Sequence, residues 1–205
     1  MKKFVRVRAA RFSPGGELVV SGGDDKTVRL WDTNQRACIR TFYDHTGPVN
    51  DVTFHPDGLC VAACSSDHTI KIWDIRMNQL LQHYAAHQDS VNSISIHPSG
   101  DYMVSASSDM TTKIWDLREG HLCYTLHGHE RGVSAVAFSP AGDFLASGSA
   151  DENVLVFKTN FVPPISEADA PATLPRGDDK PEFAPVYIES ERETTSPNSR
   201  RLRNK

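Results

Sequence analysis

The amino-acid sequence predicts an all-β fold built from four consecutive copies of one unit. Four segments repeat the same residue pattern every 42 positions, beginning at Ser13, His55, His97 and Ser139. Within each copy, short apolar runs alternate with turn residues, and the 3.6-residue spacing of an amphipathic helix is absent. Self-similarity at a fixed period indicates a repeat architecture, so the copies are expected to stack on one another.

At several equivalent positions of the copies, residues of the same type recur 42 positions apart, with no insertion or deletion. The conserved turn residues of the four copies are Pro14, Pro56, Pro98 and Pro140, then Gly16, Gly58, Gly100 and Gly142, then Asp25, Asp67, Asp109 and Asp151. An aromatic residue closes each copy, at Trp31, Trp73, Trp115 and Phe157. Upstream, His45, His87 and His129 keep the same step, and the first copy has Lys3 in that place. So many coincident columns exclude chance.

The second copy illustrates the local structure that we expect. Val52 and Phe54 alternate with polar residues, and the tetrapeptide His-Pro-Asp-Gly follows as a turn. An apolar run at residues 59–64, a polar turn and an alternating run at residues 69–73 then predict two further strands. Residues 80–84 supply a fourth. Each of the first three copies is therefore expected to form four short strands.

The period, the histidine and the closing Trp-Asp resemble the WD40 family, over residues 1–158. The resemblance implies a β-propeller, in which each repeat forms a four-stranded antiparallel blade around a central channel. We expect repeats at 1–43, 44–85, 86–127 and 128–159, which together form a domain over 1–159. The proline-rich residues 160–205 are expected to be a disordered tail.

The WD40 resemblance also implies a hydrogen-bonded tetrad of His, Ser, Asp and Trp in each blade. The residues assigned to these tetrads are His45, Ser65, Asp67 and Trp73; His87, Ser107, Asp109 and Trp115; His129, Ser149 and Asp151; and Asp25 and Trp31. Ser105 is an alternative to Ser107. A shared metal or acid–base site is the competing interpretation, but the 42-residue step places each His–Asp pair in its own blade. We therefore expect no catalytic residues, no metal and no cofactor.

Four repeats are fewer than the family usually has, which is about seven. We expect the C-terminal part of a larger ring, truncated at its N-terminal side. A closed four-bladed propeller and an open arc completed by another chain are the alternatives. The last blade is expected to have three strands and an open edge, because residues 159–172 do not predict another strand. The apolar residues Val186, Tyr187 and Ile188 are expected to be idle.

Composition excludes several other classes of function. The net charge is −4 and no run of basic residues predicts a nucleic-acid groove. No apolar stretch is long enough to span a membrane, and the N-terminus lacks the apolar segment of a signal peptide. The cysteines are expected to be small buried hydrophobic residues in a reducing compartment, with a zinc site as the remote alternative; they are Cys38, Cys60, Cys64 and Cys123.

Some wording is more specific than the repeat requires. The stretches LLQHY, FHPDG, DYMVSASSD, LREGHLCYTLHGH and the closing TNF resemble the last blades of the proteome-of-centriole WD40 proteins. This resemblance implies a scaffold of centrioles and basal bodies, in the cytoplasm and cytoskeleton at the centrosome, that supports centriole stability and cilium formation. It implies centriolar proteins, and tubulin or microtubules, as partners, and no nucleic acid, membrane or small-molecule substrate. The coiled coil of that family is absent after residue 160.

The surface that binds partners is expected in the loops of one face. In the family, the loops between repeats and those that carry the tetrad aspartate share a face, which suggests His68, Asp89, Met110, Arg131 and Glu152. A general WD40 adaptor in a ubiquitin-ligase, chromatin or transport complex is the alternative function. An enzyme would need a set of nucleophile, base and orienting group outside the repeat, and the sequence shows none.

Overall fold

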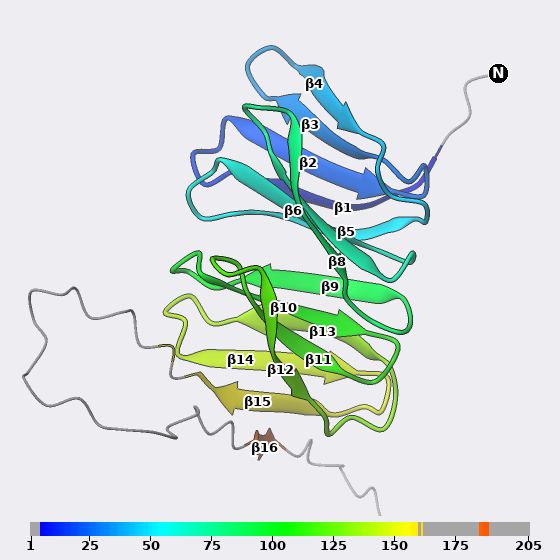
Figure 1. Ribbon diagram of the computed structural model, residues 1–205, viewed down its shortest axis with the longest axis vertical. Helices are drawn as coiled ribbons and strands as arrows, with labels where there is room; N and C mark the ends of the chain where they lie inside the picture. The colour runs from blue at the N-terminus through cyan, green and yellow to red at the C-terminus, as the bar shows by residue number, and fades with distance from the viewer. Residues whose placement is uncertain (1–4, 160, 162–184, 189–205) are drawn as a thin grey trace, which may run out of the picture.

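The computed structural model describes residues 5–159, Phe161 and the backbone of residues 185–188. It is all-β, with four antiparallel four-stranded sheets, here called blades 1 to 4 (Figure 1). Blade 1 contains β1 (Val7–Phe12), β2 (Leu18–Gly23), β3 (Val28–Asp32) and β4 (Ala37–Phe42). Blade 2 contains β5 (Val49–Phe54), β6 (Cys60–Ser65), β7 (Thr69–Asp74) and β8 (Gln79–Ala85).

Blades 3 and 4 repeat this order. Blade 3 contains β9 (Val91–Ile96), β10 (Tyr102–Ser107), β11 (Thr112–Asp116) and β12 (His121–Leu126). Blade 4 contains β13 (Val133–Phe138), β14 (Phe144–Ser149), β15 (Val154–Lys158) and β16 (Pro185–Ile188). The four strands expected in each of the first three copies are confirmed. Glycine makes the turn between the first two strands possible, because Gly58 and Gly100 have φ values of 73° and 85°.

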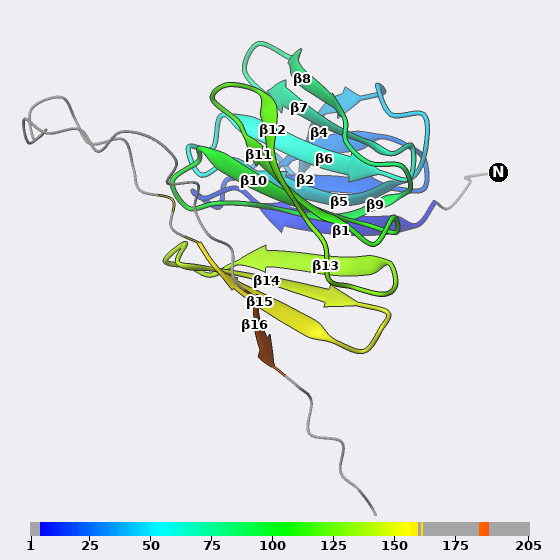
Figure 2. The same cartoon turned by 60° about the horizontal axis from the view of Figure 1, so that its bottom comes forward.

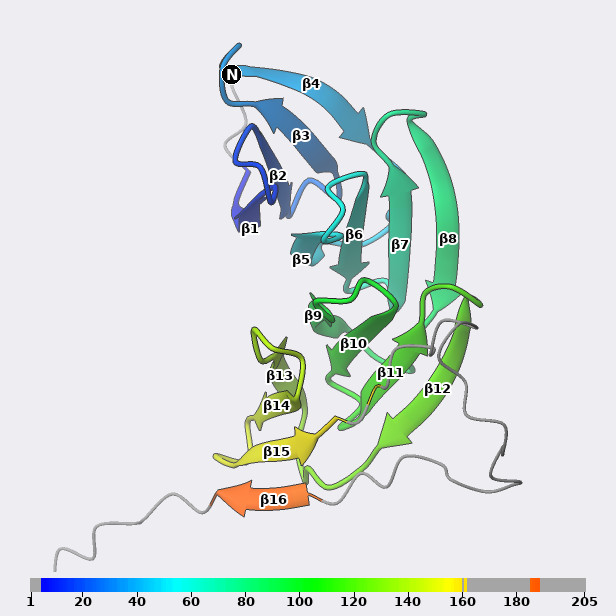
Figure 3. The ribbon, with the colours of Figure 1, turned by 90° about the vertical axis from the view of Figure 1, so that its left-hand side faces the viewer.

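The blades fan into an open arc with β1, β5, β9 and β13 along its inner side (Figure 3). Over the described residues the arc does not close, so the alternative of a closed four-bladed ring is wrong. Three apolar clusters hold neighbouring blades together. Gly22 shows how closely they pack, because a Cβ there would lie 2.4 Å from a methyl group of Val49. Each blade therefore covers one face of the next.

Among the described residues, no blade packs against the two faces at the ends of the arc. In blade 2, Val49 and Phe54 are buried against blade 1. The corresponding Val7 and Phe12 of blade 1 are 62% and 70% exposed. At the other end, Phe144 and Val154 of blade 4 are exposed on the face that would meet a following blade. We call these surfaces the front end face, at blade 1, and the back end face, at blade 4.

The expectation of a three-stranded last blade is wrong. The backbone of β16 pairs antiparallel with β15, from Val154 opposite Ile188 to Phe157 opposite Pro185 (Figure 2). The residues expected to be idle thus supply the fourth strand. The physical reason is that β15 would otherwise leave a row of unpaired backbone groups. The rest of the expected disordered tail lies outside the described residues, except Phe161.

Candidate functional site

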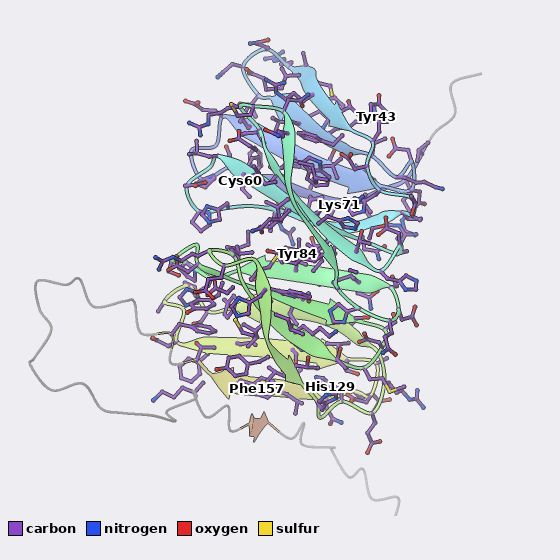
Figure 4. All side chains as sticks on the ribbon, viewed as in Figure 1. Tyr43, Cys60, Lys71, Tyr84, His129 and Phe157 are labelled. Atoms are coloured by element: carbon purple, nitrogen blue, oxygen red, sulfur yellow. The ribbon has the colours of Figure 1, made fainter. Side chains whose placement is uncertain are left out.

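The loops of the arc lie on two opposite edges. Since the strands of each blade are antiparallel, the turn between the second and third strands shares an edge with the loop leading to the next blade. We call this the tetrad edge, and the other the turn edge. In Figure 4, His129 and Tyr43 lie toward the tetrad edge, and Cys60 lies toward the turn edge.

All five loop residues suggested by the sequence lie on the tetrad edge and are exposed; they are His68, Asp89, Met110, Arg131 and Glu152. His68, Met110 and Glu152 also adopt φ values of 70°, 68° and 68°. This position of the repeat therefore has to adopt a left-handed backbone conformation, whether or not its side chain binds a partner. Asp89 and Arg131 lie in the loops between blades, where no such requirement applies.

Blade 3 contains a complete tetrad on this edge. The Trp115 indole N–H donates to Ser105 Oγ at 2.9 Å. Ser105 Oγ lies 2.8 Å from His87 Nε2, and His87 Nδ1 lies 2.8 Å from Asp109 Oδ2. The indole can only donate, so the serine hydroxyl donates onward to Nε2 and Nδ1–H donates to the carboxylate. The four side chains thus form one directed chain of hydrogen bonds.

The serine assignment from the sequence is wrong in all three blades where it was made. Ser105, which the sequence offered only as an alternative, binds the histidine and the tryptophan. Ser107 instead accepts from the Asp109 N–H and donates to the Asp89 carbonyl. Ser65 and Ser149 accept from the N–H of the aspartate two positions later in the same way. Serines two apart share a face of a strand, and only the reach of the histidine ring distinguishes them.

Blades 1 and 4 contain parts of the same network. In blade 4, His129 contacts Asp151 at 3.0 Å and Ser147 Oγ at 2.8 Å, and Phe157 adds no donor. In blade 1, Trp31 donates to Ser21, while the carboxylate of Asp25 accepts from Thr27 and Arg29. Residue 3, which corresponds to the histidines, lies outside the described residues. Ser21, Asp25 and Trp31 line a cavity of about 240 Å³ in blade 1.

Blade 2 departs from the pattern in a way that the sequence analysis missed. The serine position is Ala63, so the Trp73 N–H donates instead to the Asp44 carboxylate at 2.8 Å. His45 still contacts Asp67 at 2.9 Å, but its buried Nε2 has no hydrogen-bond partner. The sequence could have revealed this departure. When the four repeats are compared at steps of 42 residues, the other three repeats have a serine where blade 2 has Ala63; these are Ser21, Ser105 and Ser147.

The tetrad side chains have shifted acidities. Burial lowers the pKa of His45 and of His87, despite their aspartate partners. Burial alone would raise the pKa of Asp109, but hydrogen bonds from Thr111 and from the Gln88 N–H lower it to about 2. Against the same opposing effect of burial, hydrogen bonds from Thr69 and His45 hold the pKa of Asp67 well below its usual range. The His45–Asp67 and His87–Asp109 pairs therefore each join a neutral histidine to a carboxylate.

Two lysines, one buried and one partly buried, stabilise the loops that carry these histidines. Lys71 Nζ donates to the Asp44 carbonyl at 2.7 Å, and Lys113 Nζ donates to the Ala86 carbonyl at 2.8 Å. Both lysines lie on the third strand, two residues before the tryptophan (Figure 4 labels Lys71). Sequence reasoning did not single them out. Each ties a third strand to the loop that precedes its own blade.

The His–Asp pairs are held apart, one to a blade. Within the described ranges, no group of three or more His, Cys, Asp and Glu side chains is arranged to hold a metal ion. The described part of the chain also has no long apolar helix of the kind that crosses a membrane. Cys64 is buried and Cys60 and Cys123 are partly buried, but Cys38 is exposed, so the expectation of burial is wrong for Cys38.

Histidines of a second column join neighbouring blades at the turn edge. His55 Nε2 lies 2.9 Å from the Gly100 carbonyl, and His97 Nε2 lies 3.2 Å from the Gly142 carbonyl. The ring of Phe161 stacks on Tyr102 with their centroids 4.0 Å apart. It also meets His97 and Phe138 edge-on. These contacts place the residue that ends the TNF stretch in the joint between blades 3 and 4.

Comparison with known proteins identifies the repeat. The family model described as "WD domain, G-beta repeat" matches residues 3–32, 36–74, 78–116 and 120–158. Cleavage stimulation factor subunit 50 of Arabidopsis thaliana is 44% identical over 57 residues, which are 22% of this chain and 13% of that protein. The probable E3 ubiquitin ligase complex SCF subunit sconB of Emericella nidulans is 48% identical over 46 residues, 22% of this chain and 7% of that protein.

A third relative widens the range of functions. Nuclear distribution protein nudF 1 of Talaromyces marneffei is 44% identical over 46 residues, which cover 22% of this chain and 10% of that protein. Each of these three matches thus spans a small part of a much longer protein. The named functions of the three relatives differ from one another, so the shared property is the repeat.

Proposed function

We propose, on the premise that this chain belongs to the WD40 repeat family, that it is a non-catalytic scaffold that binds other proteins. One observation carries this proposal. The chemically distinctive side chains of the tetrad edge are bonded to one another inside single blades, which leaves a rigid edge with exposed loops. Such an edge presents side chains for contact without forming a reaction centre.

The test compares one loop residue with a matched control on the other edge. Arg131→Glu reverses a charge on the tetrad edge, and Arg36→Glu makes the same change in the exposed β3–β4 turn on the turn edge. We expect Arg131→Glu to weaken co-purification of cellular partners, measured by quantitative mass spectrometry, and Arg36→Glu to leave it unchanged. Equal partner sets for the wild type and both variants would contradict a role for this loop.

We further propose that the scaffold serves centrioles and basal bodies and contacts centriolar proteins or microtubules. The support for this is the sequence of the stretches LLQHY, LREGHLCYTLHGH and TNF, whose residues the WD40 repeat does not require. The test is the location of the tagged gene product in ciliated cells. We expect it at centrioles and basal bodies, and its absence from both would reject this assignment.

A general adaptor is the second candidate, because matched relatives include a protein named as a ubiquitin-ligase subunit. The two candidates predict different neighbours in a proximity-labelling experiment. Centriolar proteins among the labelled set would favour the first, and ubiquitin-ligase subunits without centriolar proteins would favour the second.

A further inference from the structure

A cavity of about 190 Å³ lies at the turn edge between blades 2 and 3. Its lining is mostly apolar and includes His55, Cys60, Ile72, Leu81, Ile96 and Leu117. Cys60 lies on the turn-edge side of blade 2 (Figure 4). Leu81 is 51% exposed, which is unusual for a leucine that faces other apolar side chains.

The corresponding place between blades 3 and 4 is occupied by the chain itself. A shift of 42 residues carries His55, Cys60 and Ile96 onto His97, Tyr102 and Phe138. The ring of Phe161 contacts those same three side chains, at centroid distances of 5.2, 4.0 and 6.1 Å. The joint between blades 3 and 4 thus shows what the architecture accepts at this point, namely one aromatic ring.

We propose that the cavity between blades 2 and 3 binds an aromatic side chain presented by an extended segment of a partner protein. The inference rests on the proposed scaffold function and names a surface and a class of partner for it. It places this contact on the turn edge, away from the loops of the tetrad edge.

Among the described residues, none fills this cavity in the way that Phe161 fills its counterpart. The residue 42 positions before Phe161 is Glu119, whose side chain is 73% exposed. After β11 the chain turns through Gly120 directly into β12, whereas after β15 it continues to Phe161. The ring for the second joint therefore has to come from outside blades 2 and 3.

The walls of the cavity suit such a ring. Cys60 and Ile96 are smaller than their counterparts Tyr102 and Phe138, which leaves space between the blades. His55 is fixed at Nε2 by the Gly100 carbonyl and at Nδ1 by the Asp57 N–H, which donates to it at 3.3 Å. The imidazole is thus held as an edge for an incoming ring, as His97 is for Phe161. Burial and the nearby Asp57 raise the pKa of the Cys60 thiol, so Cys60 acts as an apolar wall rather than a nucleophile.

The probe is an acetylated and amidated peptide with the sequence Lys-Thr-Asn-Phe-Val, which is that of residues 158–162. It is titrated into the full 205-residue chain and followed by NMR chemical shifts. We expect saturable binding, with shifts confined to the joint between blades 2 and 3. Replacement of the peptide phenylalanine by alanine removes the buried ring, and we expect affinity to fall by at least about tenfold.

Variants of the chain locate the binding. Leu81→Glu places a charge at the mouth of the cavity and is expected to weaken the peptide by about tenfold or more. Leu80→Glu is the matched control, because Leu80 is also exposed on β8 but does not line the cavity. Cys60→Tyr supplies the stacking partner found at Tyr102, so we expect it to tighten binding.

Three results would overturn the assignment. The first is that the peptide shows no saturable binding to a chain with a native circular dichroism spectrum. The second is that Leu81→Glu and Leu80→Glu weaken binding equally. The third is that the chain self-associates and Leu81→Glu abolishes this, which would make a second copy the occupant. The proposed scaffold function is judged separately. If Arg131→Glu still removes cellular partners while the peptide fails to bind, only the cavity assignment falls.

Discussion

Ser105 connects the two halves of the blade 3 tetrad, since it alone contacts both His87 and Trp115. Ser105→Ala would leave the indole N–H and Nε2 without a partner in a buried site. We expect the free energy of unfolding to fall by about 1–3 kcal/mol, measured by urea denaturation. Ser147→Ala is the matched control. Because Phe157 has no N–H, this variant leaves only the Nε2 of His129 without a hydrogen-bond partner. A loss as large as that of Ser105→Ala would contradict this account.

Ala63 offers the opposite experiment. Its position in blade 2 is that of Ser105, and the buried Nε2 of His45 lacks a partner there. Ala63→Ser supplies a hydroxyl, and we expect a gain of about 1 kcal/mol in the free energy of unfolding. Ala62→Ser is the control, because Ala62 faces the apolar cluster between blades 2 and 3 and should lose stability. Destabilisation by both serines would show that the site has no room for the hydroxyl.

The tetrads also predict how stability depends on pH. His45 and His87 have pKa values below the ordinary 6.5, so their contribution is complete above that pH and is lost as pH falls through the lower folded values. Asp109, with a pKa of about 2 against an ordinary 3.8, adds a loss as pH falls below about 4. We expect the urea midpoint to decline in these two stages. A midpoint that stays constant from pH 7 to pH 4 would contradict the histidine part.

For single residues, the sequence predicts the His–Asp pairs better than it predicts the complete hydrogen-bond networks of the tetrads. The WD40 resemblance implied that each histidine pairs with an aspartate, and the 42-residue step assigned each pair to its own blade. It could not decide between Ser105 and Ser107, which point from the same face of β10. It also gave no account of Asp44, which takes the Trp73 N–H only because Ala63 cannot.

Among the elements, β16 is the one that the sequence analysis did not foresee. Strands that follow a short turn are predictable, since alternation and turn residues define both ends, as in β6 and β7. The partner of β15 instead returns after residues 159–184, and pairing over such a separation leaves no local signal. The apolar run at 186–188 was the available clue, and its correct interpretation required the open edge of β15.

Removal of β16 should affect β15 selectively. A chain that ends at Ala184 loses the pairing between Val154 and Ile188 and between Val156 and Val186. We expect the amides of β15 that face β16 to exchange faster, measured by hydrogen–deuterium exchange. The amides of β7 and β11, the equivalent strands with intact partners, should be unchanged. Equal protection of β15 in both chains would show that β16 contributes no stable hydrogen bonds.

For the whole molecule, the two end faces predict association. Every blade joint packs a front face on a back face, and the front end face and back end face present the same kinds of residue without a cover. Phe12→Asp or Phe144→Asp should therefore reduce self-association of the 205-residue chain, measured by sedimentation at increasing concentration. Tyr43→Asp, at an exposed aromatic residue outside these faces, is the control. Equal association of all variants would contradict a role for the end faces.

Each described blade consists of its own four strands, and this has a mechanical consequence. A tension applied between the chain ends has no interlocked strand to overcome between one blade and the next. Of the described strands, only β15 lies beside the last strand, β16, so a pull from the C-terminus loads that pair first. We expect an optical-trap recording to show the arc extending in successive steps, each releasing about one 42-residue repeat, rather than in one rupture.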